Sequence, residues 1–416
     1  MLKKLSKFKA RIIIFFAIFG PGVISAIADN DAGGVATYSI AGSRFGYSML
    51  FVLLLVTILL AITQEIGARI AIVTKAGLGD LIREHYGIRI SMVIFAFLFV
   101  ANMGSIIANF AGITASLQLF NVPVLPFLII FSFLIVLFIA LGNYKANQKL
   151  FLVLSFLPIA YIISAVLAKP DWGLAARSLI IPTGIKLTPA FIFTSIALLG
   201  TTVTPWGQFF ISSFINDKKM SKSHLKYEQA EVYVGAFLTD LFAFFIIVAV
   251  AATLYKNGIV VTGAKEAALA IKPFAGSLST ILFGIGLLSA SYMGAVIIPL
   301  TTAYAFSEFF GTEGSLDLPF AKSPLFYGLF LAQLAIAFVV VLFPGISLFK
   351  IVLFTQSLNG ILLPVVIFFL LKFANDKKLM GQYVNNSFYN VFAIVSAVLI
   401  VCASLFILIG GLLGKI

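Results

Sequence analysis

The chain has 416 residues, of which 61% are hydrophobic and 10% are charged, and its formal net charge is +13. Soluble domains carry about a quarter charged residues, so this composition excludes a water-soluble globular protein. A single cysteine excludes an internal disulfide. Basic residues in so apolar a chain are typical of membrane orientation and do not indicate a nucleic-acid partner.

Apolar segments follow one another almost without interruption. Each is long enough, at about 20 residues, for a helix to cross a bilayer, and together they predict eleven transmembrane helices. These spans are expected at residues 12–43, 48–73, 90–118, 124–142, 149–168, 189–215, 229–255, 275–307, 324–343, 348–372 and 389–413. We therefore expect an all-α membrane protein, with residues 1–416 forming a single transmembrane domain surrounded by the lipid bilayer.

The distribution of lysine and arginine predicts the orientation of these spans. With the N-terminus inside, most basic residues fall in cytoplasmic segments, including those at 3–11 and 218–226. The positive-inside rule then places the N-terminus in the cytoplasm and the C-terminus outside. No small-residue cleavage site of the usual kind accompanies the first span, so we expect it to remain in the mature protein. The expected location is the cell (inner) membrane.

The first span is interrupted by polar residues and glycines. Residues 29–34 read Asp-Asn-Asp-Ala-Gly-Gly. Non-helical backbone inside a membrane is tolerated only where it lines a cavity or is buried in protein, and a carboxylate there is costly and usually functional. Asp31 is therefore predicted to bind a cation, with helix capping as the alternative. For Asp29 we consider a contact with a hydrated ion, a charge at the rim and a helix N-cap.

The sixth span contains a second interruption. Residues 200–207 read Gly-Thr-Thr-Val-Thr-Pro-Trp-Gly. Pro205 removes a helix hydrogen bond and frees the carbonyl of Thr201 one turn earlier. The carbonyls of Ala28 and Thr201 become candidate ligands if both breaks form. The hydroxyl of Thr204 is another candidate, although interior threonines often bond back to their own helix. Trp206 is expected to line or gate the pathway.

Later spans add a few polar candidates. Gln356 in the tenth span is a candidate to contact the ion or its waters, with a helix-to-helix hydrogen bond as the alternative, and Asn359 lies one turn further on. Asp240 in the seventh span is expected in a gating or structural network. The sequence offers no phosphate loop and no nucleophile–base pair, so neither an enzyme nor a bound cofactor is expected.

The two interruptions lie five spans apart. Interrupted helices at corresponding positions in two halves are typical of inverted-repeat transporters with a binding site near the membrane midplane. We therefore predict a LeuT-type architecture with broken first and sixth helices. Residues 12–168 would form the first repeat (spans 1–5), residues 189–372 the second (spans 6–10), and residues 389–413 an extra C-terminal helix.

Several motifs in fixed order resemble the Nramp (natural resistance-associated macrophage protein) family. They are Gly20-Pro21-Gly22, the first-span break, Gly46-Tyr47, Gln64-Glu65-Ile66-Gly67-Ala68-Arg69 and Arg83-Glu84, with the sixth-span break and Gln356 followed by Pro364 further on. The resemblance covers most of the chain. It implies a secondary transporter that moves divalent metal cations by alternating access.

The chain departs from the family pattern at the positions expected to hold the metal. Asp31-Ala32-Gly33-Gly34 takes the place of Asp-Pro-Gly-Asn, so the aspartate is kept and Gly34 replaces an amide ligand. Thr204-Pro205-Trp206 takes the place of Met-Pro-His, which removes a thioether. The third span has Asn102 and Asn109 but no acidic residue. These departures resemble the Nramp-related magnesium transporters.

The chemistry of these departures predicts the transported ion. Thioether sulfur favours softer transition metals, whereas Mg²⁺ takes oxygen ligands and keeps several waters. We expect uptake of Mg²⁺, and also of Mn²⁺, as a partly hydrated ion without obligatory proton coupling. Three alternatives remain open: a proton-coupled importer of Mn²⁺ or Fe²⁺, a sodium-coupled organic-solute symporter of the same fold, and a structural or channel-like membrane protein without alternating access.

Overall fold

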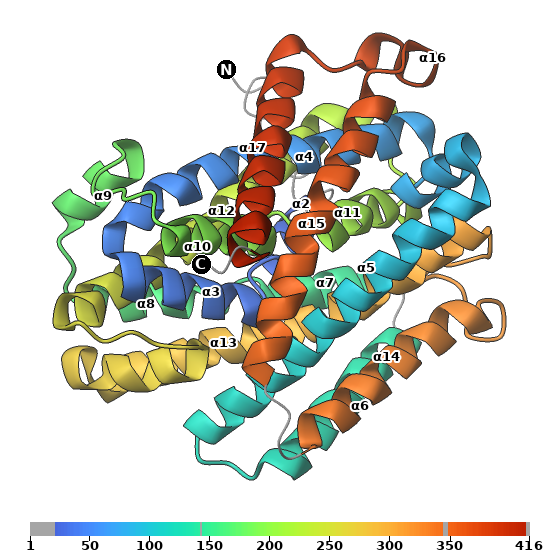
Figure 1. Cartoon of the computed structure of the whole chain (residues 1–416). Coiled ribbons are helices and arrows are strands. Elements are labelled where there is room, and N and C mark those ends of the chain that lie inside the picture. Colours follow the sequence, from blue (N-terminus) through green and yellow to red (C-terminus); the bar gives the residue numbers. More distant parts are fainter. Residues whose placement is uncertain (1–20, 142–143, 344–347, 413–416) are drawn as a thin grey trace, which may run out of the picture.

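The computed structural model describes residues 21–141, 144–343 and 348–412, and all regular elements in these ranges are helices. The start of the first predicted span, residues 12–20, and the last residue of the eleventh lie outside the described residues. Figure 1 shows a bundle of long helices with shorter pieces between them.

The long helices overlap the predicted spans, as expected because backbone groups in lipid must be satisfied within the helix, but several begin or end outside the predicted bounds. The helices are α2 (Pro21–Ala28), α3 (Ala32–Phe45), α4 (Met49–Thr74), α5 (Leu78–Leu119), α6 (Val124–Leu141), α7 (Tyr144–Leu154), α8 (Ile159–Leu167), α9 (Trp172–Ile180), α10 (Pro189–Thr202), α11 (Pro205–Asp217), α12 (Leu225–Thr253), α13 (Ala264–Phe310), α14 (Pro324–Leu342), α15 (Leu348–Ala374), α16 (Lys377–Met380) and α17 (Ser387–Leu412). Four 3-10 turns accompany them: η1 (Gly46–Ser48), η2 (Lys222–His224), η3 (Tyr255–Asn257) and η4 (Gly381–Tyr383).

Within the described residues, seven helical segments are long and apolar enough to cross a membrane, or eight if the bent pair Leu358–Ala374 and Lys377–Tyr383 is one span. Val124–Ile139 and Ser387–Ala403 are shorter apolar helices. One of the seven segments, Ala32–Thr74, includes parts of two predicted spans. The all-helical, multi-span prediction is confirmed, whereas the count of eleven stays a prediction.

Both predicted interruptions are present. The first separates α2 from α3 and the second separates α10 from α11. Pro205 is the first residue of α11, where the missing N–H would have had no helical partner in any case. The fifth predicted span, expected as a continuous helix, is also interrupted, since α7 ends at Leu154 and α8 begins after Pro158.

Two long helices bend at glycines. Gly87 in α5 has a φ of 77° and Gly276 in α13 has a φ of 82°. Glycine adopts such positive φ values without the clash that a Cβ would cause. Each bend separates a short N-terminal piece from the long remainder of the helix. The predicted spans at 90–118 and 275–307 correspond to the long remainders.

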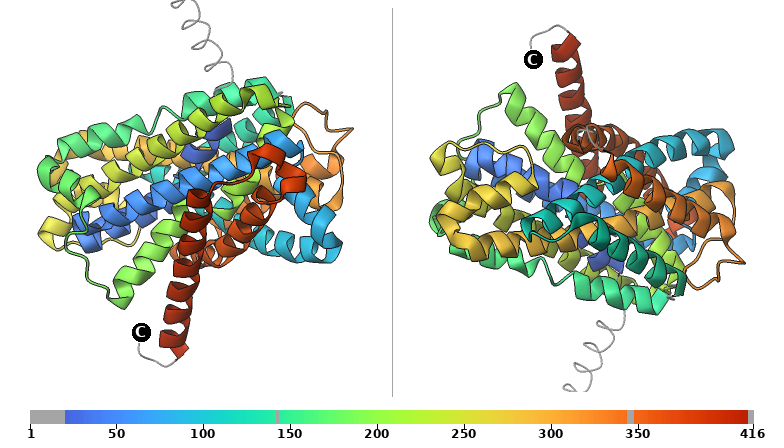
Figure 2. Two further views of the ribbon diagram at one scale, coloured as in Figure 1. Left: turned by 90° about the horizontal axis from the view of Figure 1, so that it is seen from above. Right: turned by 90° about the horizontal axis from the view of Figure 1, so that it is seen from below.

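The broken helices lie inside the bundle. Figure 1 shows α5 and α13 side by side, and this pair has the most extensive contact in the molecule. The helices α2 and α3 pack against α12, which also contacts α4. Figure 2 shows α17 on the outside, where it contacts α15 and extends beyond the other helices. The unwound backbone is therefore enclosed by protein, as a break within a membrane requires.

Candidate metal site

The first break is organised around Asp31. Its Oδ1 accepts a hydrogen bond from the backbone N–H of Gly34 at 2.9 Å, so the residue caps α3. Its Oδ2 accepts from Asn109 Nδ2 at 2.9 Å, and Asn109 Oδ1 accepts from the N–H of Ala32 at 3.0 Å. The carboxylate is buried and its orientation is set by both neighbours. Asp31 therefore does cap α3, and its carboxylate still lies beside the break.

Asp29 joins the two breaks. Thr204 donates to its Oδ1 at 2.5 Å, and Gln64 Nε2 donates to its Oδ2 at 3.1 Å. Thr204 also caps α11 by accepting from the N–H of Gly207 at 3.1 Å. Asp29 is only 1% exposed. A rim position and an N-cap are therefore both wrong for Asp29, because it is buried and Asp31 is the cap.

Gln356 approaches the break from α15. A Cβ built on Gly33 would collide with the amide nitrogen of Gln356 and lie 3.1 Å from Asp31 Oδ1. The amide and the carboxylate therefore face each other across Gly33, and only a residue without a side chain leaves this space open. Asn359 Nδ2 makes a long contact with Gln356 Oε1, at 3.5 Å. Both α15 candidates are buried near the break.

The space at Gly34 is small. A Cβ there would lie 3.2 Å from the carbonyl oxygen of Asp29, 3.4 Å from a ring carbon of Tyr38 and 3.5 Å from the hydroxyl of Thr201. That hydroxyl is buried and has no hydrogen-bond partner in the described part of the chain. The carbonyl of Thr201 cannot receive a helical bond from Pro205, which has no N–H. Ala28, the last residue of α2, is also buried.

Asp240 lies behind the break. It is buried in α12, and the hydroxyl of Thr57 faces it. The carbonyl of its neighbour Thr239 accepts a hydrogen bond from Asn30 Nδ2 at 2.5 Å. This part of α12 therefore supports the unwound segment through Thr239, and the gating or structural network expected for Asp240 stays a prediction.

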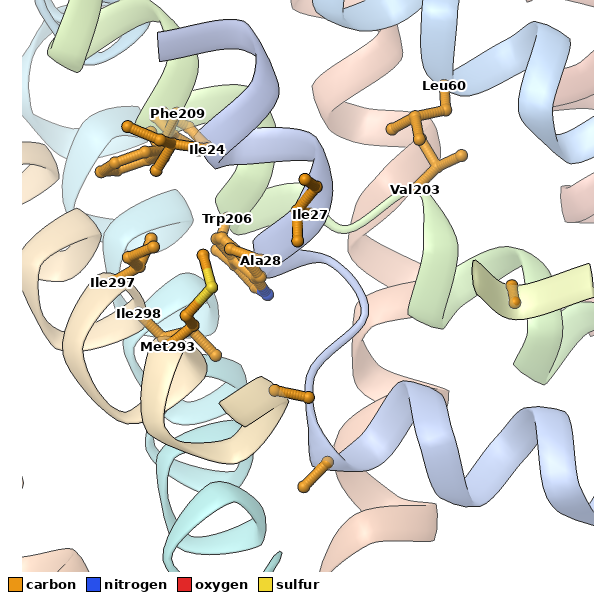
Figure 3. Packing of buried hydrophobic residues seen from close by; sticks show 14 of the residues in the cluster. Ile24, Ile27, Ala28, Leu60, Val203, Trp206, Phe209, Met293, Ile297 and Ile298 are labelled. Carbon is orange, nitrogen blue, oxygen red and sulfur yellow. The ribbon is translucent and has the colours of Figure 1, made fainter. Parts of the chain in front are cut away.

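Trp206 closes one side of the break. Figure 3 shows it beside Ala28, with Ile24, Met293 and Ile297 around it. All of these residues are buried, and the indole ring is fully enclosed. The indole ring therefore lies buried beside the break, and the role of Trp206 as a wall or gate stays a prediction.

A cavity reaches the break from another direction. We call it the apolar cavity; its volume is about 280 Å³ and its lining includes residues of α3, α5, α10 and α13. Ala32 and Gln356 line it next to the break, and Lys265 and Glu266 line it at the start of α13. The break is therefore approached by a cavity on one side and covered by Trp206 on another.

Two residues at the breaks and one at the start of α2 were not predicted as site residues. Asn109 and Gln64 each donate to a break aspartate. Glu231 Oε1 accepts from the first backbone N–H groups of α2, those of Gly22 at 3.0 Å and Val23 at 3.2 Å. Amide side chains in the middle of apolar spans were the available signal for Asn109 and Gln64. Glu231, near the start of the seventh predicted span, was considered only for a gating or structural network.

The side chains that meet at the breaks offer oxygen donors. They are the carboxylates of Asp29 and Asp31, the amide of Gln356 and the hydroxyls of Thr201 and Thr204. The described residues contain no group of three or more histidine, cysteine, aspartate or glutamate side chains that could hold a metal. The oxygen atoms of these carboxylate, amide and hydroxyl groups suit a hard cation that keeps part of its water shell.

Comparison with known proteins identifies the family. The family model described as natural resistance-associated macrophage protein-like matches residues 22–410. The chain belongs to the Nramp family. Two relatives named divalent metal cation transporter MntH are similar to it over most of both chains. The Agrobacterium fabrum protein is 26% identical over 88% of this chain and 81% of its own length. The Listeria welshimeri protein is 24% identical over 94% and 89%.

Solved structures show the same fold. A crystal structure of a variant of the Eremococcus coleocola manganese transporter has a TM-score of 0.75 at 19% identity, covering 93% of this chain and 85% of that one. MhsT in complex with L-phenylalanine has a TM-score of 0.58 at 16% identity, covering 94% and 97%. The LeuT-like fold is therefore confirmed. This Nramp protein is a multi-pass membrane transporter of divalent metal cations, and it is not an enzyme.

The hydroxyl of Thr204 provides a test of the link between the breaks. We expect Thr204→Val to lower apparent metal affinity by at least about tenfold, because the change removes a helix cap and leaves buried Asp29 short of a hydrogen-bond donor. These losses cost about 1 kcal/mol and about 1–3 kcal/mol. Thr204→Ser keeps both hydrogen bonds and should stay within about twofold of wild type. Half-saturation of uptake in proteoliposomes measures the effect. A lower melting temperature with unchanged affinity would assign Thr204 to stability alone.

Proposed function

We propose that this Nramp protein transports hard divalent cations, Mg²⁺ together with Mn²⁺, as partly hydrated ions. The observation that carries the proposal is the meeting of Asp31 Oδ1 and the Gln356 amide at Gly33, with the Asp29 carbonyl oxygen and the Thr201 hydroxyl at the neighbouring Gly34. At the position of the family's methionine, Thr204 contributes a hydroxyl that is bound to Asp29. Oxygen donors without a thioether favour Mg²⁺ relative to softer metals.

Some of the proposed residues would bind the ion or its waters, and others would hold those residues in position. Asp31 would bind the ion directly, and Gln356 would contact it or its waters. The carbonyls of Ala28 and Thr201 would complete the set, and Asp29 would contribute charge through the water shell. Asn109, Gln64 and Thr204 would hold these groups in place, Asp240 would belong to the network behind the break, and Gly34 stands in the place of the family's amide ligand.

The proposed organisation has eleven spans. Spans within residues 12–168 and 189–372 would form two inverted repeats, and residues 389–413 an additional helix. The N-terminus would lie in the cytoplasm and the C-terminus outside the cell membrane. Under this orientation the apolar cavity opens outward, and Trp206 covers the cytoplasmic side of the site. Alternating access would then require Trp206 and the N-terminal half of the first span to move.

A second candidate is a proton-coupled importer of Mn²⁺ or Fe²⁺. The name of a structural relative, a manganese transporter, favours this candidate over Mg²⁺. The oxygen ligands at the breaks, without a thioether, are the observation that favours Mg²⁺. An organic-solute symporter has no comparable support, because the family match points to metal cations.

A competition panel tests the proposed selectivity. Wild-type proteoliposomes would be given trace Mn²⁺ with increasing Mg²⁺, Ca²⁺ or Zn²⁺ outside. We expect Mg²⁺ in millimolar-scale excess to reduce Mn²⁺ entry by at least about half, because an oxygen site that keeps ion waters discriminates weakly between these ions. Protein-free liposomes are the control. Mn²⁺ entry that is insensitive to Mg²⁺ would support the second candidate.

A further inference from the structure

A second cavity lies at the other end of α12 from the apolar cavity. We call it the basic pocket; its volume is about 460 Å³ and it is bordered by α4, the start of α12, η4 and the start of α17. The side chains that matter here are those of Arg69, Lys222, Lys226, Gln229, Tyr383 and Tyr389. None of these residues contributes to the candidate metal site.

The basic pocket has a surplus of positive charge. Glu65 is paired with Arg69, through contacts of 2.8 and 3.0 Å, and also accepts from Gln229 at 2.7 Å. The charges of Glu65 and Arg69 cancel, so the positive charges of Lys222 and Lys226 remain. In the described ranges neither lysine has a carboxylate within ion-pair distance. Burial and then the nearby Lys222 lower the pKa of Lys75, as expected where positive charges gather.

The two lysines are available to a ligand. Both are exposed, and they lie one helical turn apart, Lys222 in η2 and Lys226 in the first turn of α12. The Lys222 ammonium lies over the ring of Tyr383, 5.8 Å from its centre, which holds the charge at the pocket. This arrangement suits an anionic group such as a phosphate.

The surface next to the pocket changes from polar to apolar along one face of α12. Lys226, Tyr233 and Phe237 follow at helical spacing, and Phe237 is 60% exposed. The hydroxyl of Tyr233 is hydrogen-bonded to that of Tyr389 on α17. Tyrosines of this kind mark the boundary between headgroups and hydrocarbon.

This order of groups matches one class of molecule. A phospholipid has a phosphate, a glycerol backbone and acyl chains in sequence, and the surface presents lysines, tyrosine hydroxyls and apolar side chains in the same sequence. We propose that the basic pocket binds the phosphate headgroup of an anionic phospholipid, with Lys222 and Lys226 as charge partners and an acyl chain along Tyr233 and Phe237. Under the proposed orientation this lipid belongs to the cytoplasmic leaflet, where basic pockets bind such headgroups.

Native mass spectrometry of the full-length protein in detergent tests the proposal. Wild type, K222Q/K226Q and K377Q/K378Q would each be titrated with phosphatidylglycerol and with phosphatidylcholine. The control pair lies on α16 and does not line the pocket, and it removes the same charge. We expect K222Q/K226Q to lose the preference for phosphatidylglycerol by about 25-fold, about fivefold per lysine. The control should change it by less than about threefold.

Three results would overturn the proposal. Equal binding of the two lipids by wild type would remove the charge argument. An equal loss in K377Q/K378Q would show that general surface charge, and not the pocket, attracts the lipid. Displacement of phosphatidylglycerol by soluble glycerol phosphate at similar concentration would assign the pocket to free phosphate compounds. Loss of the preference in K222Q/K226Q but not in the control, with no displacement by glycerol phosphate, would support the lipid.

Discussion

Asp31→Asn is expected to abolish saturable metal uptake in a folded protein. The substitution keeps the shape of the side chain, and its oxygen can still accept from the N–H of Gly34. It removes the charge that faces the space beside Gly33 and Gln356. Removing one partner of a buried ion pair costs about 3–5 kcal/mol, so apparent affinity should fall by more than about a hundredfold. Uptake of Mn²⁺ into proteoliposomes measures the loss.

The control for this variant is Asp171→Asn. Asp171 is exposed and caps α9 by accepting from the N–H of Leu174 at 2.9 Å, so the same chemical change is made far from the breaks in the chain. Its uptake should match wild type within about twofold. A melting temperature for each variant separates loss of binding from loss of folding. Saturable uptake by Asp31→Asn at wild-type affinity would eliminate Asp31 as the central ligand.

The fold was largely predictable from hydropathy. The second span was expected at 48–73 and α4 occupies Met49–Thr74, because an apolar run in lipid has little choice but helix. Hydropathy reports burial and does not report backbone direction, however. The interruption before Pro158 and the bends at Gly87 and Gly276 were therefore missed. Glycine and proline permit such bends, but packing decides which of them bend.

The site was predictable only on the broken helices themselves. Asp31 and Thr204 stand beside glycine or proline, and that local pattern predicts exposed backbone within a span. The partners that orient the carboxylates come from distant parts of the chain. Asn109 is 78 residues from Asp31, and Gln64 is 35 residues from Asp29. No periodicity within one span reports these contacts, since they depend on how helices pack.

The contacts of Gly34 and Thr204 with Asp29 limit which substitutions can restore the family's metal ligands. An asparagine at Gly34 would restore the family's amide, but its Cβ would lie 3.2 Å from the Asp29 carbonyl, closer than ordinary contact. A methionine at Thr204 would restore the thioether, but it would remove the donor to Asp29 and the cap of α11. Conversion towards transition-metal preference therefore needs changes around Asp29 as well as at these two positions.

Uptake should be driven by membrane potential and respond little to a pH gradient. Proton coupling needs a titratable group that gains and loses its proton during the cycle. The third span offers the amides of Asn102 and Asn109, and Asn109 donates to Asp31. Bound metal favours the ionised form of Asp31. Asp29 and Asp240 remain as carboxyl groups for carrying a proton. Titratable groups for proton coupling are therefore few near the breaks.

For a dication, a potential of about 100 mV, inside negative, supplies about 4.6 kcal/mol, which corresponds to an accumulation of roughly two-thousandfold at equilibrium. Proteoliposomes with a potassium diffusion potential and an internal pH-sensitive dye measure both quantities after addition of Mg²⁺ or Mn²⁺. The Asp31→Asn protein is the matched control for leak. We expect potential-dependent metal entry without a change in dye signal. Sustained acidification that follows metal entry, with charge compensated by valinomycin and potassium, would show that protons accompany the metal and would favour the proton-coupled manganese importer.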